Sequence, residues 1–335
     1  MKKPHKKFVY NDFPRDGYYM KNFYDIQPAL NYGYLNPDPN HPWEQGYDEA
    51  GPTAVRNELK NIIAFWCDKG VDGFRVDMAA SLVKADEDSA ETIKLWQDFR
   101  AFLDKEYPHC AMVSEWGVPA KSIEGGFHMD FMLHFGPPAY TSLFRSEHPF
   151  FSREGKGDIR IFLDAYLSDL SSTQKKGLIC IPSSNHDMPR LARGRDVRDL
   201  KICFAFLLTM AGAPFIYYGD EIGMQGYRDP FNRGYYCWDS HEERLKPVLA
   251  QLAQLRHSCE AFRTGALRVL RAEGGVLHYQ RVGATETAEI IVNRSEHIIV
   301  EPLASGKHTE VNPMGFTIVV EENGHNPNHS YYDIQ

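Results

Sequence analysis

Strand-like and helix-like segments alternate along the middle of this 335-residue chain, and this alternation constrains the fold more than any other feature. Helix-like stretches occur at 53–69, 91–107 and 158–170, and an apolar helix-like stretch occurs at 200–212. Around them lie the short apolar runs "GFRV", "AMVSEW", "MDFMLHF", "GLICIP" and "PFIYYG". Strands that alternate with helices form right-handed βαβ units with a parallel sheet. The sequence therefore predicts an α/β fold.

Acidic side chains follow three of these apolar runs. Asp77 ends "GFRVD", Glu115 ends "MVSE" and Asp187 ends "SSNHD". Any one of them alone is more often a helix cap or a solvated loop residue. The active sites of (β/α) barrels, however, gather at the carboxyl ends of the strands. Because three carboxylates on one face repel one another, their collection there indicates chemistry and favours a (β/α)-type barrel.

Three regions of the chain differ in pattern. Residues 1–52 are rich in Tyr, Asn, Pro and Asp with little periodicity, which predicts a long loop region. Residues 53–260 carry the alternating pattern of the predicted barrel. From 261 to 335 short β-type runs are separated by turns, which predicts a small all-β C-terminal domain.

Composition narrows the partners and the compartment. A formal net charge of -8 supplies no counterion-release drive toward nucleic acid or an anionic membrane, so we expect neither partner. The most apolar stretch, "ICFAFLLTMAGAPFIYY", is short for a bilayer span and contains Gly and Pro. The basic start "MKKPHKKF" is not followed by an apolar run, and the six cysteines form no CxxC pair. These features predict a cytoplasmic protein with reduced thiols.

Glycoside hydrolysis is a reaction that needs such a set of carboxylates. A retaining glycosidase uses two carboxyl groups about 5 to 5.5 Å apart, one as nucleophile and one as acid. Arg75 and Asp77 are two residues apart in a predicted strand and so point to the same side. A guanidinium beside a carboxylate favours its ionised form, as a nucleophile requires. Asp72 stands at the strand start, where we expect a structural role.

These motifs carry a family resemblance. The segments "DGFRVDMA", "VSEW", "SNHD" and "PFIYYGDEIGM" occur in that order, preceded by "FYDIQPALNYGYLNP". Together they resemble the α-amylase family of glycoside hydrolases, in its oligosaccharide α-glucosidase and neopullulanase-like branch. The resemblance runs over about residues 18 to 320.

The resemblance implies roles for individual residues. Asp77 matches the nucleophile, Glu115 the general acid/base, and Asp187 a carboxylate that binds sugar hydroxyls in the transition state. Arg75 would orient Asp77, and His186 would donate to a sugar hydroxyl. Arg190 in "NHDMPR" would also bind substrate, although an Arg at a helix start is commonly a surface cap. Asp220 and Glu221 are expected to brace the loop after the last strand of the barrel.

The sequence also departs from the family pattern. The first family motif, an Asp followed by Asn-His, is missing before Gln27, which predicts a (β/α)8-type barrel without its first three strands. On this reading residues 1–52 are the end of an inserted loop domain and its connection. Ala29 stands where many relatives have an Asp associated with structural calcium, so no calcium and no other cofactor is implied. The position directly after the nucleophile tracks linkage preference in the family, but Met78 at this position does not distinguish α-1,4 from α-1,6 linkages.

Three functions remain open at this point. The leading hypothesis is a retaining hydrolase of α-glucosidic bonds in small α-glucan or α-glucoside oligosaccharides such as maltodextrins. A transglycosylase or isomerase of the same family shares the glycosyl-enzyme intermediate and differs in what attacks it. A non-catalytic relative is the third, favoured by the missing first motif and disfavoured by the presence of Asp77, Glu115 and Asp187. The oligomeric state is left open.

Overall fold

Two compact units make up the chain, and each is described by itself. The computed structural model describes residues 8–10, 17–133, 139–152, 156–173, 176–239, 244–324, 329–332 and 334. Unit 1 comprises Met1–Met112 with Glu124–Gly126, and unit 2 comprises Val113–Ile123 with Phe127–Gln335. The division passes through one strand, β4 (Ala111–Ser114).

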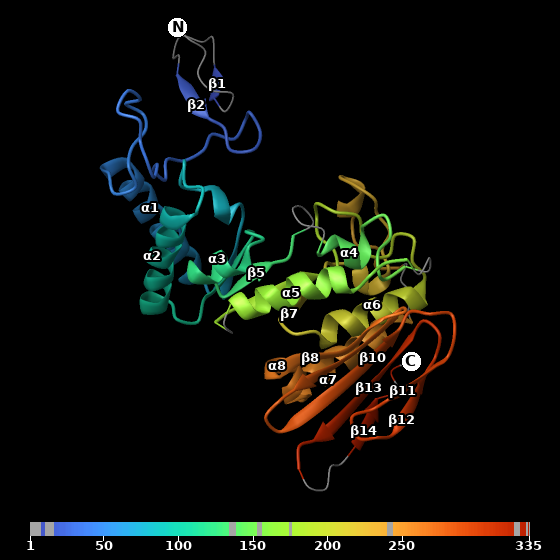
Figure 1. The fold of residues 1–335 in the computed structure, drawn as a ribbon. Helices are drawn as coiled ribbons and strands as arrows, with labels where there is room; N and C mark the ends of the chain where they lie inside the picture. Colours follow the sequence, from blue (N-terminus) through green and yellow to red (C-terminus); the bar gives the residue numbers. More distant parts are fainter. Residues whose placement is uncertain are drawn as a thin grey trace. The chain divides into compact units, whose positions relative to one another are not determined.

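Unit 1 is built from two long helices and short strands (Figure 1). Its elements are β1 (Phe8–Tyr10), β2 (Tyr18–Met20), α1 (Ala50–Cys67), β3 (Gly73–Val76), η1 (Ala79–Ser81), α2 (Ala90–Glu106) and the start of β4. Apolar side chains at helical spacing bury one face of α2, namely Leu95, Trp96, Phe99 and Leu103. Lys60 of α1 forms a 2.7 Å ion pair with Asp98 of α2, so the two helices lie side by side.

Parallel strands form the first half of unit 2. The end of β4 pairs with β5 (Met129–Phe131), which pairs with β6 (Leu178–Pro182), which pairs with β7 (Ala213–Phe215). The helices and 3-10 turns of this half are α3 (Pro119–Glu124, whose last residue belongs to unit 1), α4 (Thr141–Phe144), α5 (Arg160–Ser172), α6 (Val197–Thr209), η2 (Asp220–Ile222), η3 (Phe231–Arg233), α7 (Leu245–Ser258) and α8 (Glu260–Thr264). The order of the whole sheet is β3-β4-β5-β6-β7. The predicted parallel α/β sheet is therefore confirmed, whereas the absence of three earlier barrel strands stays a prediction.

The second half of unit 2 is a set of antiparallel strands. A five-stranded sheet has the order β14-β13-β10-β9-β8, and β11 pairs with β12 in a separate ribbon. The strands are β8 (Ala266–Glu273), β9 (Val276–Val282), β10 (Glu286–Asn293), β11 (Ile299–Pro302), β12 (His308–Val311), β13 (Gly315–Glu322) and β14 (His329–Tyr332). This agrees with the all-β C-terminal region that the sequence predicts, and β12 and β14 are additions that the pattern did not reveal.

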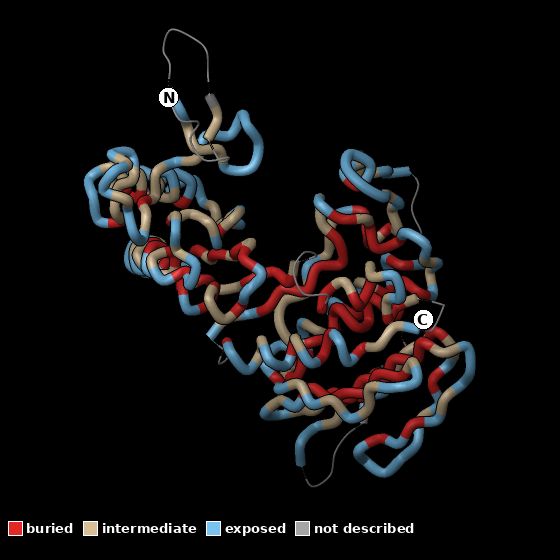
Figure 2. The backbone as a smooth tube through the Cα atoms, turned by 45° about the horizontal axis from the view of Figure 1, so that its top comes forward, coloured by how far each residue is buried: buried red, intermediate tan, exposed pale blue. Residues whose placement is uncertain are grey.

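Helix α6 lies at the centre of the unit 2 core. Every residue from Leu200 to Thr209 except Lys201 is buried. Buried residues are coloured red in Figure 2. Tyr279 on β9 hydrogen-bonds Thr209 of α6, and Arg281 donates to the Thr209 carbonyl at 2.9 Å. A helix that is apolar on all sides must be covered on all sides. One hydrophobic core therefore joins the parallel strands, α6 and the antiparallel sheet. Among the described segments, no helix has both the length and the apolar character needed to cross a membrane.

Candidate active site

The predicted nucleophile lies at the end of β3 in unit 1. Asp77 directly follows the strand, and its Oδ1 accepts from the Arg75 guanidinium at 2.5 Å, as the two-residue spacing predicts. The Asp77 side chain is 66% exposed and that of Arg75 is 37% exposed, so the ion pair faces solvent. Met78 adopts a left-handed conformation with φ of 48°, which turns the chain sharply after Asp77.

Glycine at position 73 lets β3 start close to β4. A Cβ on Gly73 would lie 2.5 Å from the Ala111 carbonyl oxygen, and the Asp72 carbonyl accepts from the Ala111 amide at 2.9 Å. Asp72 thus stands at the entrance of the strand, at the end opposite to Asp77, where its structural role was expected.

The predicted acid/base residue follows β4 and is bracketed by hydrogen bonds. Glu115 is the first residue after the strand and is half-buried. The next two backbone amides, of Trp116 and Gly117, donate to Asp130 Oδ1 at 3.1 and 3.3 Å. Ser114, on the other side, donates to the same oxygen at 2.6 Å. Asp130 therefore holds the chain on both sides of Glu115.

Asp130 is an ionisable group in the core. It lies inside β5 with no exposed surface, and burial raises its pKa to about 6, against the lowering effect of its hydrogen bonds. Its second oxygen, Oδ2, has no hydrogen-bond partner among the described residues. An acid within an apolar strand is the signal in "MDFML" that sequence reasoning overlooked.

Asp187 sits in a loop after β6 with a histidine and an arginine. Its carboxylate lies 3.2 Å from His186 Nε2 and 3.1 Å from the Arg233 guanidinium. Arg233 also donates to the His186 carbonyl at 3.0 Å, and Asn232 donates to it at 2.7 Å. The 3-10 turn η3 thereby fixes both the backbone and the carboxylate of this loop. Arg233 was not among the predicted site residues, because nothing in "DPFNR" indicates contact with "SNHD".

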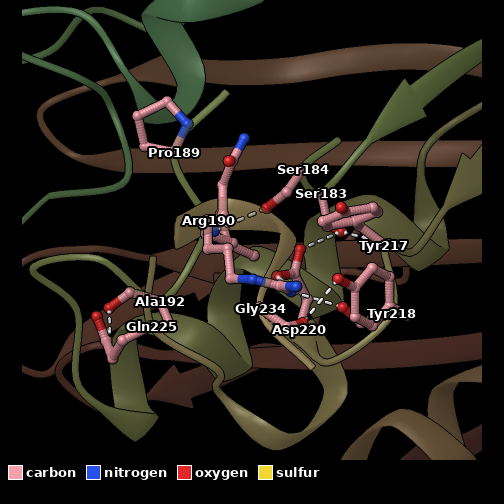
Figure 3. Close-up of polar contacts among 12 residues, drawn as sticks. Ser183, Ser184, Pro189, Arg190, Ala192, Tyr217, Tyr218, Asp220, Gln225 and Gly234 are labelled. Atoms are coloured by element: carbon pink, nitrogen blue, oxygen red, sulfur yellow. Dashed lines mark hydrogen bonds and ion pairs between the residues drawn. The ribbon is translucent and has the colours of Figure 1, made fainter. Parts of the chain in front are cut away.

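Arg190 requires a correction, because its side chain does not reach the surface. Its side chain is 0% exposed, and its guanidinium packs against the rings of Tyr217 and Tyr218, 4.7 and 4.6 Å from their centroids (Figure 3). It donates to the Tyr218 carbonyl at 2.5 Å and lies 3.4 Å from Asp220 Oδ1. Neither a substrate contact nor a surface cap fits this position, so Arg190 is a buried brace of the loop after β7.

The loops after β6 and β7 share this buried network. Asp220 Oδ2 accepts from Ser183 Oγ at 2.7 Å, and Ser183 Oγ accepts from the Tyr217 amide at 3.0 Å. Burial raises the pKa of Asp220, although the nearby serines and arginines lower it. The expected bracing role of Asp220 agrees with these contacts. Figure 3 shows the Asp220 carboxylate among Ser183, Arg190 and the two tyrosines.

The structure brings the predicted residues together in two groups. Arg75 and Asp77 form one pair in unit 1. In unit 2, Glu115 follows β4 and Asp187 follows β6, and both of these strands run parallel to β5 between them. Their carboxyl ends therefore lie at the same edge of the sheet. A single site that joins Asp77 to Glu115 and Asp187 stays a prediction. Among the described residues, no group of three or more His, Cys, Asp or Glu side chains could hold a metal ion.

Curated proteins similar to this chain carry the names of cyclomaltodextrin enzymes. A cyclomaltodextrinase from Geobacillus thermopakistaniensis (strain MAS1) is 29% identical over 303 residues, covering 86% of this chain and 47% of that protein. A cyclomaltodextrin glucanotransferase from Bacillus sp. (strain 38-2) is 28% identical over 267 residues, covering 76% of this chain and 35% of that protein. The chain thus spans half or less of the length of these curated relatives.

A solved structure and a family model also match this chain. The solved structure of the cyclic alpha-maltosyl-(1→6)-maltose hydrolase from Arthrobacter globiformis matches with a TM-score of 0.66 at 22% identity, covering 82% of this chain and 61% of that one. This likeness shows a shared fold. The family model of the alpha-amylase catalytic domain matches residues 47–266, well over half of the chain. The chain therefore belongs to the alpha-amylase family.

Proposed function

We propose that this chain carries the catalytic residues of a retaining enzyme that acts on α-glucosidic bonds of maltodextrin-like oligosaccharides. The observation that carries the proposal is the Arg75–Asp77 pair at the end of β3, an exposed carboxylate with a guanidinium 2.5 Å away. Membership of the alpha-amylase family and relatives named for maltodextrin-type substrates support it.

Each proposed step uses a residue of the chain. The Asp77 carboxylate attacks the anomeric carbon while the Glu115 carboxyl group protonates the departing glycosidic oxygen. The sugar is then held as an ester of Asp77. Glu115, now ionised, removes a proton from the attacking water or sugar hydroxyl, which displaces Asp77 and restores the anomeric configuration. Asp187 and His186 bind sugar hydroxyls, with Arg233 holding the Asp187 carboxylate.

Hydrolysis and transfer are separated by what attacks the intermediate. The relatives include a cyclomaltodextrinase and a glucanotransferase, so both outcomes belong to this proposal. Product analysis of a maltodextrin digest, with and without an excess of a labelled acceptor sugar, distinguishes them. Labelled longer products indicate transfer, and unlabelled short sugars alone indicate hydrolysis.

The Glu115→Gln variant tests the acid/base assignment. We expect turnover of maltodextrins to fall about 10²- to 10⁴-fold, because glutamine cannot protonate the leaving oxygen. Cleavage of a nitrophenyl α-glucoside, whose leaving group needs no proton, should lose less in its first step. Glu124→Gln, an exposed glutamate at the end of α3, is the matched control and should leave turnover unchanged.

Two results would contradict this mechanism. Near-normal maltodextrin turnover by Glu115→Gln would remove Glu115 from the acid/base role. Complete inactivity of the unmodified protein on maltodextrins and on the nitrophenyl α-glucoside would favour a non-catalytic relative. Asp77→Asn provides a further check, because loss of the nucleophile should abolish cleavage of both substrates.

A further inference from the structure

Two cysteines of unit 1 lie in contact although they are 43 residues apart in sequence. Cys67 is the last residue of α1, and Cys110 directly precedes β4. Their Sγ atoms are 3.2 Å apart. Both residues are buried, with 5% and 3% of their surfaces exposed. The proposed glycosidase chemistry uses neither of them.

Contact between two thiols is the arrangement from which a disulfide forms. A disulfide needs the two sulfur atoms at bonding distance, which a small rotation of the side chains can provide when the thiols already touch. We propose that Cys67 and Cys110 are a site of reversible oxidation, at which a disulfide joins the end of α1 to the start of β4. This inference does not depend on the proposed function.

The oxidation balances with a small-molecule disulfide such as oxidised glutathione as the oxidant. The thiolate of one cysteine attacks the glutathione disulfide, forms a mixed disulfide and releases one glutathione thiolate. The second cysteine then attacks the protein sulfur of the mixed disulfide and releases the second glutathione. The two protein thiols lose two electrons and two protons, and one oxidised glutathione becomes two reduced molecules.

Burial makes this reaction slow near neutral pH. Burial and the hydrogen bond with Cys110 raise the pKa of the Cys67 thiol to about 12. The thiolate is the reacting form of the thiol. If Cys67 attacks first, the rate should therefore rise about tenfold for each unit by which the pH increases, as long as the pH is below that pKa. The pair therefore differs from Cys237, an exposed thiol that an oxidant reaches directly.

The disulfide would close a loop that contains β3 and the Arg75–Asp77 pair. Cross-links that close long loops stabilise mainly by restricting the unfolded chain. Oxidation should therefore raise the melting temperature of unit 1, and thiol reduction should reverse the change.

The test uses the Cys237→Ser variant, in which intermolecular cross-linking through the exposed thiol is removed. The folded protein is incubated with oxidised glutathione at pH 7 and pH 9, remaining thiols are alkylated after unfolding, and peptides are identified by mass spectrometry. We expect one cross-linked peptide pair that contains Cys67 and Cys110. Its mass should be the sum of the two reduced peptides minus two hydrogen atoms. It should form faster at pH 9, with a rise in melting temperature of about 5 °C or more.

Matched serine variants assign the effect. Cys67→Ser and Cys110→Ser should lose the cross-link and the rise in melting temperature. Cys180→Ser, which changes a buried cysteine of unit 2, should keep both. If Cys67 and Cys110 of the folded protein stay reduced at pH 9, or each carries a separate glutathione, the proposal is wrong. The peptide measurement on the Cys237→Ser protein decides this even if a further serine variant does not fold.

Discussion

At the scale of single residues, one buried carboxyl group beside Glu115 sets a pH dependence of stability. Burial raises the pKa of Asp130 to about 6, above the ordinary value near 4 that it has in the unfolded chain. Below about pH 4 both states hold the proton. As the pH rises from 4 to 6 the unfolded chain releases it more readily, so the free energy of unfolding falls and then levels off above pH 6.

Asp130→Asn should remove this dependence. The amide keeps an oxygen for Ser114, Trp116 and Gly117 and places its NH₂ where Oδ2 has no partner among the described residues. Relative to the unmodified protein, the variant should gain about 2 kcal/mol in free energy of unfolding between pH 4 and pH 7.5, as measured by urea titration at both pH values.

Asp158→Asn is the control of opposite sign. The Arg160 side chain lowers the pKa of exposed Asp158, so its stabilising effect is present above its unfolded pKa and is lost as the pH falls. That variant should therefore lose stability relative to the unmodified protein as the pH rises. A difference between Asp130→Asn and the unmodified protein that does not change with pH would show that Asp130 is not held at a raised pKa.

Arg233 is the second residue whose role emerges from contacts. Its guanidinium lies on the Asp187 carboxylate and its Nε donates to the His186 carbonyl. Under the proposed function, Arg233→Ala should lower kcat/KM on maltodextrins about 10- to 100-fold, because the carboxylate loses its orientation. The melting temperature should change little, since the side chain is half exposed. Arg198 is an exposed arginine at the start of α6, and Arg198→Ala should leave kcat/KM unchanged. An equal loss of kcat/KM in Arg198→Ala would mean that the loss in Arg233→Ala does not come from its contact with Asp187.

At the scale of elements, the buried Arg190–Asp220 pair joins the loop after β6 to the loop after β7. Two nitrogens of Arg190, Nε and Nη2, lack hydrogen bonds among the described residues, and the guanidinium packs against the tyrosine rings. Removing one partner of a buried pair leaves the other charge uncompensated, which costs more than the pair itself contributes.

A double-mutant cycle should measure this coupling. Arg190→Met and Asp220→Asn should each destabilise the protein, Arg190→Met by about 3 kcal/mol. The double variant should be less destabilised than the sum by about 1 to 3 kcal/mol, as measured by urea unfolding. The exposed pair Arg160 and Asp158 serves as the comparison and should be additive within about 0.5 kcal/mol. Additive effects at Arg190 and Asp220 would mean that the two side chains act independently.

At the scale of the whole molecule, the antiparallel sheet is part of the core that holds α6. Tyr279 and Arg281 on β9 bond to Thr209, and apolar residues of β9, β10 and β13 pack in the same cluster as those of α6. Without the sheet, the apolar side chains of α6 that pack against it would be exposed and would drive association. The parallel strands of unit 2 therefore depend on the C-terminal strands for a buried core.

A chain that ends before Ala261 should test this dependence. We expect it to aggregate or to bind a hydrophobic dye strongly, because α6 loses the cover of the sheet. A chain that ends after Gly324 removes only the edge strand β14 and should stay folded, as measured by circular dichroism and size-exclusion chromatography. A monomeric, cooperatively melting product from the shorter chain would show that α6 is covered without the sheet.

Local patterns in the sequence account for the elements and for the residues that end the strands. The strand "GFRV" coincides with β3, and α2 begins one residue before its predicted start, since both depend on periodicity within a few residues. The Arg75–Asp77 contact follows from the same alternation of side chains. The family motifs added the alpha-amylase assignment, which the family comparison confirms.

Contacts between distant segments were decided only by the tertiary structure. The burial of Arg190 depends on tyrosines almost thirty residues away, and the roles of Asp130 and Arg233 depend on packing across β4, β5 and the loop after β6. The contact of Cys67 with Cys110 has the same origin. Periodicity reports which side of an element is apolar, but it carries no information on which distant side chain fills the space opposite. The sequence by itself therefore determined the strands and helices with a clear periodic pattern and the acidic residues at the strand ends. The three-dimensional packing decided which of the charged groups face solvent and which brace the core.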